Sequence, residues 1–478
     1  IDNVAEISAA SNALGLPDED SQPGDNGGDA PETDTDDEED DNGPHGNGMT
    51  DNPADADDFD LARVSIETVS LGSTVFLDNN NDGFQNGADT GIVNVEVQLF
   101  DADTEMQILT DATGARVLDP ADAATVVTDA NGDYHFTNLL PGDYYVVIPS
   151  SPAAAPISSN NTGIAFSETD PDDNLDNDDE GLQPGGSGTS VSSDTITLML
   201  GDEPLNGANA GEESAQGNAQ DDVFDSNGNM TLDFGFFAPV SLGDTAFVDL
   251  NGDGLQTMGE PGIGGVTVTL LDSNGDIVTL DAEGNAITGV TTTAPDGSYG
   301  FANLPPGSYS VVFDISTADN AEFYDFTTAD AGGLDEDDSD NSIALTEFTA
   351  QTNPTDFLNS GEMDLTLDVG VVCDIEVIVA EPFTICSTQP VILNEGASIS
   401  PASLGGSWST PDGTGVFTTG TDFATATTYT PSKEDALRGS VTFILTTNDP
   451  AGPCEAVSNQ VTVEVLNVDC GSFFWDGE

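Results

Sequence analysis

The sequence predicts an all-β protein made of β-sandwiches in tandem. Gly, Asp, Asn, Thr and Pro are abundant, and no long amphipathic helical pattern occurs. Apolar residues instead alternate with polar ones over short stretches bounded by turn-forming residues. One series of motifs also occurs twice in the same order, in residues 70–239 and in residues 240–372. The hydrophobic content of 36% is sufficient for several small sandwich cores.

The first motif shared by the two blocks is a twelve-residue loop, at residues 78–89 and again at residues 249–260. Each loop has side-chain oxygens at positions 1, 3 and 5, glycine at position 6 and a carboxylate at position 12, which is the ligand spacing of a calcium loop. An EF-hand would have flanking helices, but segments 69–77 and 240–248 have the pattern of strands. A polar turn without metal is the simpler alternative, and the second copy favours calcium. The expected ligands, with the main-chain carbonyls of Phe84 and Leu255, are Asp78, Asn80, Asp82, Asp89, Asp249, Asn251, Asp253 and Glu260.

Three further motifs follow each loop. Asn-Gly or Asp-Gly opens a hairpin in which aromatic residues, Tyr134 and Phe136 or Tyr299 and Phe301, alternate towards a core. A carboxylate-rich loop follows, and each block closes with an apolar strand that contains the sequence Leu-Asp-x-Gly. The acidic loops are residues 172–180 and 335–340, and the closing strands are residues 232–237 and 367–372.

Four elements occur in the same order in each block: a Ser-Leu-Gly strand, the twelve-residue loop, the aromatic hairpin and the closing Leu-Asp-x-Gly strand. These elements resemble the SdrD-type B-like domain of large bacterial surface proteins. The resemblance covers residues 70–372 and implies Cna-B-like sandwiches, secreted to the cell surface, in which calcium stiffens a stalk. It implies that the acidic loops add ligands, and the additional candidates are Asp129, Asp176, Asp178, Asp335, Asp337 and Asp340. Some Cna-B relatives are crosslinked by a Lys–Asn isopeptide bond, but neither block contains Lys. That crosslink is therefore chemically unavailable here.

Residues 373–470 form a different region, with short predicted strands around Trp408 that favour an immunoglobulin-like sandwich. The first of these strands is expected over residues 372–379. The region resembles Ig-like repeats of giant secreted proteins of Bacteroidota. That resemblance implies a Cys386–Cys454 disulfide and leaves Cys373 to pair with Cys470, although four cysteines allow three connectivities. All four cysteines lie in the C-terminal quarter, which suits an oxidising, extracellular compartment.

Composition excludes several functions. The chain has four basic and 89 acidic residues, with a formal net charge of −85. Nucleic acids and anionic lipid need clustered Lys or Arg, so neither is an expected partner. No apolar run is long enough to span a membrane. The two histidines and the many carboxylates form no recognisable catalytic set, so we expect no enzyme. Paired carboxylates in such loops are expected to bind metal or water.

Two terminal segments flank the sandwiches. Residues 1–69 are an acidic low-complexity extension, and residues 471–478 are a tail with three large aromatic side chains. Because the chain begins at Ile1, we expect it to be processed or a fragment. The predicted function is a calcium-stiffened extracellular stalk or a fibre subunit that binds copies of itself, with segment 63–69 or the aromatic tail adding a strand to a neighbour. The alternative is an adhesin whose terminal sandwich binds glycan or protein.

Overall fold

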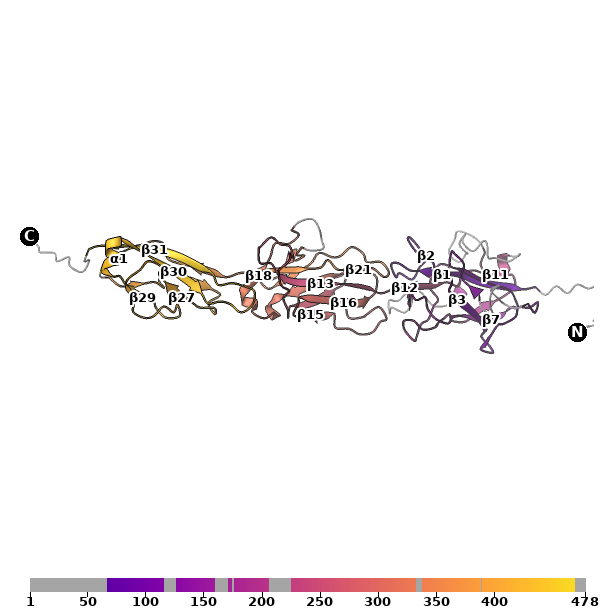
Figure 1. Ribbon diagram of the computed structural model, residues 1–478. Coiled ribbons are helices and arrows are strands. Elements are labelled where there is room, and N and C mark those ends of the chain that lie inside the picture. The colour runs from indigo at the N-terminus through magenta and orange to yellow at the C-terminus, as the bar shows by residue number, and fades with distance from the viewer. Residues whose placement is uncertain are drawn as a thin grey trace, which may run out of the picture. The chain divides into compact units, whose positions relative to one another are not determined.

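The computed structural model describes residues 67–115, 126–159, 171–173, 176–205, 225–331, 338–387 and 389–468. These residues form β-sheets almost throughout, which confirms the predicted all-β fold of tandem sandwiches (Figure 1). Within the described ranges one α-helix occurs, α1 (Lys433–Arg438), which begins at a Ser432 capping box. None of the helices described is long and apolar enough to cross a membrane. Most of the acidic extension and the aromatic tail lie outside the described residues.

The first sandwich is organised around β1 (Val69–Leu77), which matches the predicted strand. This strand pairs antiparallel with β6 (Asp133–Leu139) and parallel with β12 (Phe234–Phe237). Side chains of both sheets, including Leu71, Phe136, Leu99 and Val146, meet in one buried core. The first sheet also contains β2 (Thr90–Gly91), β8 (Ile157–Ser158) and β11 (Gly228–Asn229), and the second contains β3 (Glu96–Asp101), β4 (Met106–Gln107), β5 (Val126–Val127), β7 (Gly142–Ile148), β9 (Val191–Ser192) and β10 (Ile196–Leu198).

The second sandwich repeats this arrangement around β13 (Val240–Val248). It pairs antiparallel with β16 (Ser298–Leu304) and parallel with β22 (Val369–Cys373). Leu242 lies opposite Phe301, as Leu71 lies opposite Phe136, and both pairs follow a shift in register near the start of the strand. The remaining strands of the second sandwich are β14 (Thr267–Leu271), β15 (Val290–Thr292), β17 (Ser310–Asp314), β18 (Tyr324–Phe326), β19 (Ile343–Ala344), β20 (Thr349–Gln351) and β21 (Met363–Asp364). The described 3-10 helices are η2 (Pro171–Asp173) and η4 (Asp225–Asn227) in the first sandwich, and η5 (Ile315–Thr317) and η6 (Ala321–Phe323) in the second.

The hairpin aromatics behave as predicted in both sandwiches. Tyr134 is buried, and its hydroxyl donates a hydrogen bond of 2.6 Å to the carbonyl of Leu232 in the closing segment. Tyr299 donates the equivalent bond of 2.5 Å to the carbonyl of Leu367. Each hydroxyl gains a partner in the core, which offsets the cost of burying a polar group. The hairpin is thereby attached to the closing segment.

The third region contains three further sheets around Trp408, which is 1% exposed. The long hairpin of β30 (Ser440–Thr447) and β31 (Ser458–Leu466) pairs through seven residues of each strand. The single strand predicted over 372–379 is wrong, because β22 ends at Cys373 in the second sandwich and β23 (Glu376–Ile378) begins a new sheet. The other strands are β24 (Thr384–Cys386), β25 (Val391–Ile392), β26 (Ser398–Ser400), β27 (Gly406–Ser409), β28 (Val416–Phe417) and β29 (Thr428–Thr430).

The predicted disulfide pairing is also wrong. Cys373 pairs with Cys454, with their Cα atoms 5.8 Å apart. The predicted Cys386–Cys454 bond is sterically excluded, because Cys386 lies opposite Leu466 at the far end of β31, whereas Cys454 precedes that strand. The nine residues of β31 span roughly 26 Å at about 3.3 Å per residue, far beyond the reach of a disulfide. Cys386 is itself disulfide-bonded, and Cys470 lies outside the described residues.

Candidate metal centres

The first twelve-residue loop folds around the carboxylate of Asp78, its first position. The N–H of Gly83 donates to this carboxylate at 2.9 Å, and the N–H of Asp82 donates at 3.3 Å. Gly83 adopts a φ of 79°, the left-handed conformation that glycine at position 6 allows. Asp89, at position 12, folds back across the loop and accepts hydrogen bonds from the N–H groups of residues 79 and 86. The predicted ligand positions therefore belong to one compact turn.

The second loop has the same construction. Asp249 accepts hydrogen bonds from Gly252, Asp253 and Gly254, and Gly254 has a φ of 81°. Glu260 folds back to accept from the N–H groups of residues 250 and 257. Asn251 and Asp253 cap N–H groups within the loop, at 2.9 and 3.1 Å. Although the two loops differ at seven of twelve positions, the residues at positions 1 and 12 accept corresponding N–H bonds and the glycine at position 6 has the same left-handed conformation.

A hydroxyl group from the neighbouring strand segment holds the first residue of each loop. Ser159 hydrogen-bonds to Asp78, and Thr327 donates to Asp249 at 2.5 Å. The pKa values of the two carboxyls nevertheless shift in opposite directions. Burial raises the pKa of Asp78 to about 6, and the nearby charges of Asp89 and Asp82 add to the effect. Burial also acts to raise the pKa of Asp249, but the hydrogen bonds from Thr327 and the loop N–H groups outweigh it and lower the pKa.

The second acidic loop of each sandwich is joined to the twelve-residue loop by main-chain contacts. Phe84, at position 7, forms an antiparallel bridge with Asp178, and the N–H of Asp179 donates to the carbonyl of Gly83 at 3.0 Å. The main chain at Asp178 therefore lies beside position 7 of the loop. Asp178 is completely buried.

The same junction occurs in the second sandwich. Leu255 bridges Asp338, and the N–H of Ser339 donates to the carbonyl of Gly254 at 3.2 Å. Asp338 is 5% exposed. Asp338 belongs to the predicted acidic loop 335–340 but is not among the predicted ligands, and its contact with Leu255 could not be predicted, because the two segments are far apart in the chain.

Sequence reasoning also missed a set of buried acids around the closing strand of the first sandwich. Glu180 accepts a hydrogen bond of 2.7 Å from the N–H of Asp233, and Asp233 accepts from the Ser73 hydroxyl at 2.7 Å. Asp179 accepts from the N–H of Gly235 at 3.0 Å. Burial raises the pKa of Glu180 and of Asp233 well above their usual values, and the charges of Asp178 and Asp176 respectively raise them further.

The second sandwich has corresponding acids. Asp340 accepts from the N–H of Asp368 at 2.7 Å, and Asp368 accepts from the N–H of Thr245 at 2.9 Å. Asp233 and Asp368 of the closing motif are buried and lie immediately before β12 and β22, which each begin two residues later than the predicted closing strands. The sequence signal for these two residues is an aspartate repeated at the same place of the otherwise apolar Leu-Asp-x-Gly motif. Burial of an isolated charge is costly, so an aspartate in an apolar segment indicates a buried polar site rather than a solvent-exposed surface.

The remaining candidates divide into three groups. Asp129 caps its own hairpin turn, accepting from the N–H groups of Asn131 and Asp133 at 2.7 and 3.1 Å. Asp176 lies in the acidic loop, where it accepts a hydrogen bond from Asn177. Asp335 and Asp337 lie outside the described residues. In the described part of the chain, no three His, Cys, Asp or Glu side chains form a group ready to hold a metal ion.

The oxygen chemistry of the first loop nevertheless fits calcium. The side-chain carbonyl oxygens of Asn80 and Asn81 are buried and have no hydrogen-bond partner. Asn80 is at ligand position 3, and its amide group donates to Asp82 at 2.7 Å, so its carbonyl oxygen remains available. Calcium takes six to eight oxygen ligands, and amide and main-chain carbonyls count among them. A search for acidic side chains alone does not detect such a ligand set.

Comparison with known proteins places these motifs in a family. Serine-aspartate repeat-containing protein I of Staphylococcus saprophyticus is 34% identical over 252 residues, which are 52% of this chain and 10% of that protein. Serine-aspartate repeat-containing protein F of Staphylococcus epidermidis is 30% identical over 287 residues, 59% of this chain and 13% of that protein. The chain therefore spans only a small part of the length of these relatives.

Among solved structures, the minor pilin GBS52 of Streptococcus agalactiae covers 64% of this chain and 96% of its own, at 10% identity and a TM-score of 0.20. The major pilin subunit BcpA of Bacillus cereus covers 63% of this chain and 98% of its own, at 13% identity and a TM-score of 0.17. The family model of the SdrD B-like domain matches residues 69–184 and 240–371, which together are more than half of the chain. The chain therefore belongs to the SdrD B-like domain family.

Proposed function

We propose that this protein is an extracellular, calcium-rigidified structural protein of the bacterial cell surface, which acts as a stalk or as a subunit of a self-assembling fibre. The observation that carries the proposal is the junction between the twelve-residue loop and the second acidic loop, which recurs at Phe84–Asp178 and Leu255–Asp338. An ion held there would connect two segments that are otherwise linked by few hydrogen bonds.

Electrostatics supports a cation in this role. Asp78, Asp178, Asp179, Glu180 and Asp233 are all buried within one sandwich. The whole chain has only four Lys and Arg residues, so protein cations cannot neutralise these acids. Like charges in a low-dielectric interior destabilise the folded state, and a divalent cation ligated by the loop would reverse that effect. Calcium supplies this charge, while the side chains and carbonyls of the loops supply its shell.

Thermal unfolding of metal-stripped protein with and without calcium tests the proposal. Binding to the folded loop alone stabilises it by roughly 2.7 kcal/mol per site at a hundredfold excess over Kd. Asp253→Ala should remove much of the calcium-induced rise for the second sandwich only. Asp272→Ala is the matched control, because Asp272 caps a hairpin turn of the same sandwich through the N–H groups of Asn274 and Asp276. Asp272→Ala should lower the midpoint of thermal unfolding by the same amount with and without calcium. A wild-type midpoint that does not change when calcium is added would contradict the proposal.

Self-assembly is the second part of the proposal. The candidate strand donors are segment 63–69 and the aromatic tail, residues 471–478. Val69 is already part of β1 in its own sandwich, whereas residues 63–66 and 471–478 lie outside the described residues. Negative-stain microscopy of purified protein at millimolar calcium should show regular fibres. A monodisperse monomer under these conditions would favour the stalk.

The adhesin alternative gains nothing from Trp408. That side chain is 1% exposed and packs with the core residues of its sandwich, so its ring is not available to stack on a sugar.

A further inference from the structure

The Cys373–Cys454 disulfide joins two different sandwiches. Cys373 is the last residue of β22, where it lies opposite Tyr324 of β18 in a sheet of the second sandwich. Cys454 lies between β30 and β31 of the third. Only two residues separate the end of β22 from the start of β23. The disulfide therefore lies at the boundary between the second and third sandwiches, next to the peptide that connects them.

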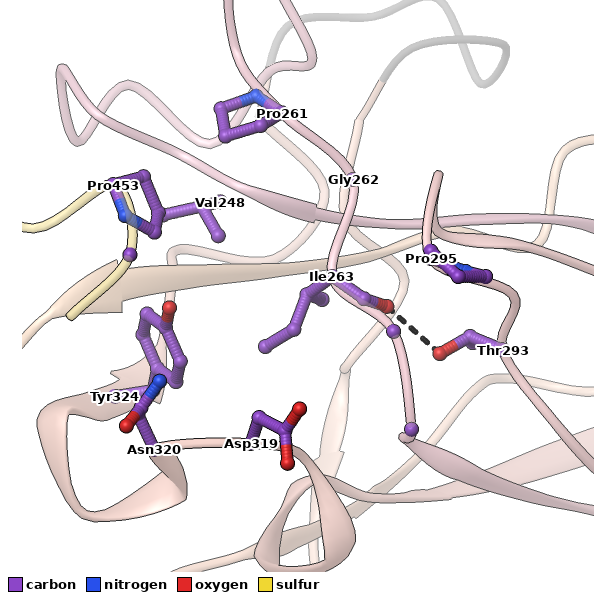
Figure 2. A pocket seen from close by; sticks show the side chains of 13 residues that line it. Val248, Pro261, Gly262, Ile263, Thr293, Pro295, Asp319, Asn320, Tyr324 and Pro453 are labelled. Carbon is purple, nitrogen blue, oxygen red and sulfur yellow. Dashed lines mark hydrogen bonds between the residues drawn. The ribbon is translucent and has the colours of Figure 1, made fainter.

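Non-covalent contacts also join the second and third sandwiches near the Cys373–Cys454 disulfide. Pro453 faces Val248 and Tyr324 of the second sandwich (Figure 2). Together with Gly452 it lines one wall of a cavity of about 530 Å³. The N–H of Asp374 donates to the carbonyl of Phe323 at 2.8 Å, which holds the connecting peptide against the second sandwich. Buried side chains of the two sandwiches belong to one continuous apolar cluster.

The position of the bond has a mechanical consequence. Cys373 and Cys454 are 81 residues apart in sequence. Tension applied to the two ends of the chain reaches Cys373 through β22 and can pass directly to Cys454 through the sulfur atoms. Residues 374–453, which include β23 to β30, then lie in a closed loop and cannot be extended. Among the strands that the structure describes up to residue 468, β31 alone follows Cys454 in the chain.

We propose that the Cys373–Cys454 disulfide is an inter-domain staple that carries tension from the second sandwich to β31 and protects the rest of the third sandwich from mechanical unfolding. Its importance in the organism depends on the proposed stalk or fibre function, but the staple itself depends on neither calcium nor assembly. A dithiol reductant would disable it, since two electrons and two protons convert the bond into two thiols while the reductant becomes a disulfide.

Single-molecule force spectroscopy on single chains tests the staple. Because Cys386 is also disulfide-bonded, the measurement uses a Cys386→Ser/Cys470→Ser background in which Cys373–Cys454 is the only bond. Complete unfolding should release about 27–29 nm more contour length after reduction than before it, from the separation of 81 residues at about 3.3–3.6 Å per residue. Additional Cys373→Ser/Cys454→Ser substitutions are the matched control, and they should give the longer value with or without reductant.

Equal contour lengths in the oxidised and reduced states of the background variant would overturn the proposal. If that variant does not fold, peptide mapping of the wild-type chain under non-reducing conditions still decides the matter. A peptide that links Cys373 to Cys454 supports the staple, and a peptide that links Cys386 to Cys454 refutes it. Loss of calcium binding or of fibres would leave each of these results unchanged, so failure of the proposed function is distinguishable from failure of the staple.

Discussion

Substitution of Asp78 by asparagine should stabilise the metal-stripped protein and destabilise the calcium-loaded one. Asp78 is completely buried, and burial raises the pKa of its carboxyl from 3.8 to about 6. The folded protein therefore binds this proton more tightly than the unfolded chain does. Stability contributed by the protonated carboxyl is present below the unfolded pKa and is lost as the pH rises to about 6.

The expected gain in stability can be calculated from the pKa shift of Asp78. A change of about two pKa units corresponds to about 3 kcal/mol of unfolding free energy at neutral pH. Asparagine has nearly the same shape and cannot ionise, so Asp78→Asn should recover most of this amount without metal. For a sandwich of this size the midpoint should rise by roughly 6–12 °C. With calcium present, loss of a charged ligand at position 1 should reverse the sign.

The assay is thermal unfolding of metal-stripped wild-type and variant protein between pH 4 and 7.5, repeated at pH 7 with calcium. The stability difference between the two proteins isolates Asp78 from the other acids of the chain. Asp249→Asn is the matched control in the second loop. Hydrogen bonds hold the pKa of Asp249 below its usual value, so this substitution should destabilise even the metal-stripped protein. The reasoning is refuted if both variants change stability in the same direction without metal, or if the Asp78→Asn difference does not grow with pH.

Three further outcomes are expected. Trp408→Ala, which empties a core position that is 1% exposed, should cost about 3–5 kcal/mol in chemical unfolding of the third sandwich; a loss under 1 kcal/mol would contradict the packing. The Asp435 carboxylate accepts hydrogen bonds from Thr414 and Tyr429. Asp435→Asn should therefore lower the free energy of unfolding of the same sandwich by about 1–3 kcal/mol, measured in urea at pH 7. Tyr429→Phe should lower it by less. Burial lowers the pKa of the His135 ring from 6.5 to about 4. The stability that the buried, neutral ring contributes should therefore be lost as the pH falls from about 6.5. An NMR titration of the ring should show a midpoint well below 6.

Features that depend on neighbouring residues in the chain could be predicted from the sequence. The turn of residues 78–89, the left-handed glycines at position 6, and the strands on either side follow from local turn chemistry and from alternation of apolar residues. The burial of Tyr134 and Phe136 follows from the same alternation. Repetition of the motifs strengthened each prediction, since an accidental pattern is not expected to recur in the same order.

Contacts between segments that are distant in sequence could not be predicted in this way. The junction of Phe84 with Asp178 and the contact of Glu180 with Asp233 depend on the register of strands that are far apart in sequence. No local spacing encodes such a register, because it results from the packing of whole sheets. The disulfide shows the same limit. Cysteine positions allow three pairings, and Cys454 pairs with Cys373 because Cys454 precedes β31, whereas Cys386 lies opposite Leu466 at the far end of that strand.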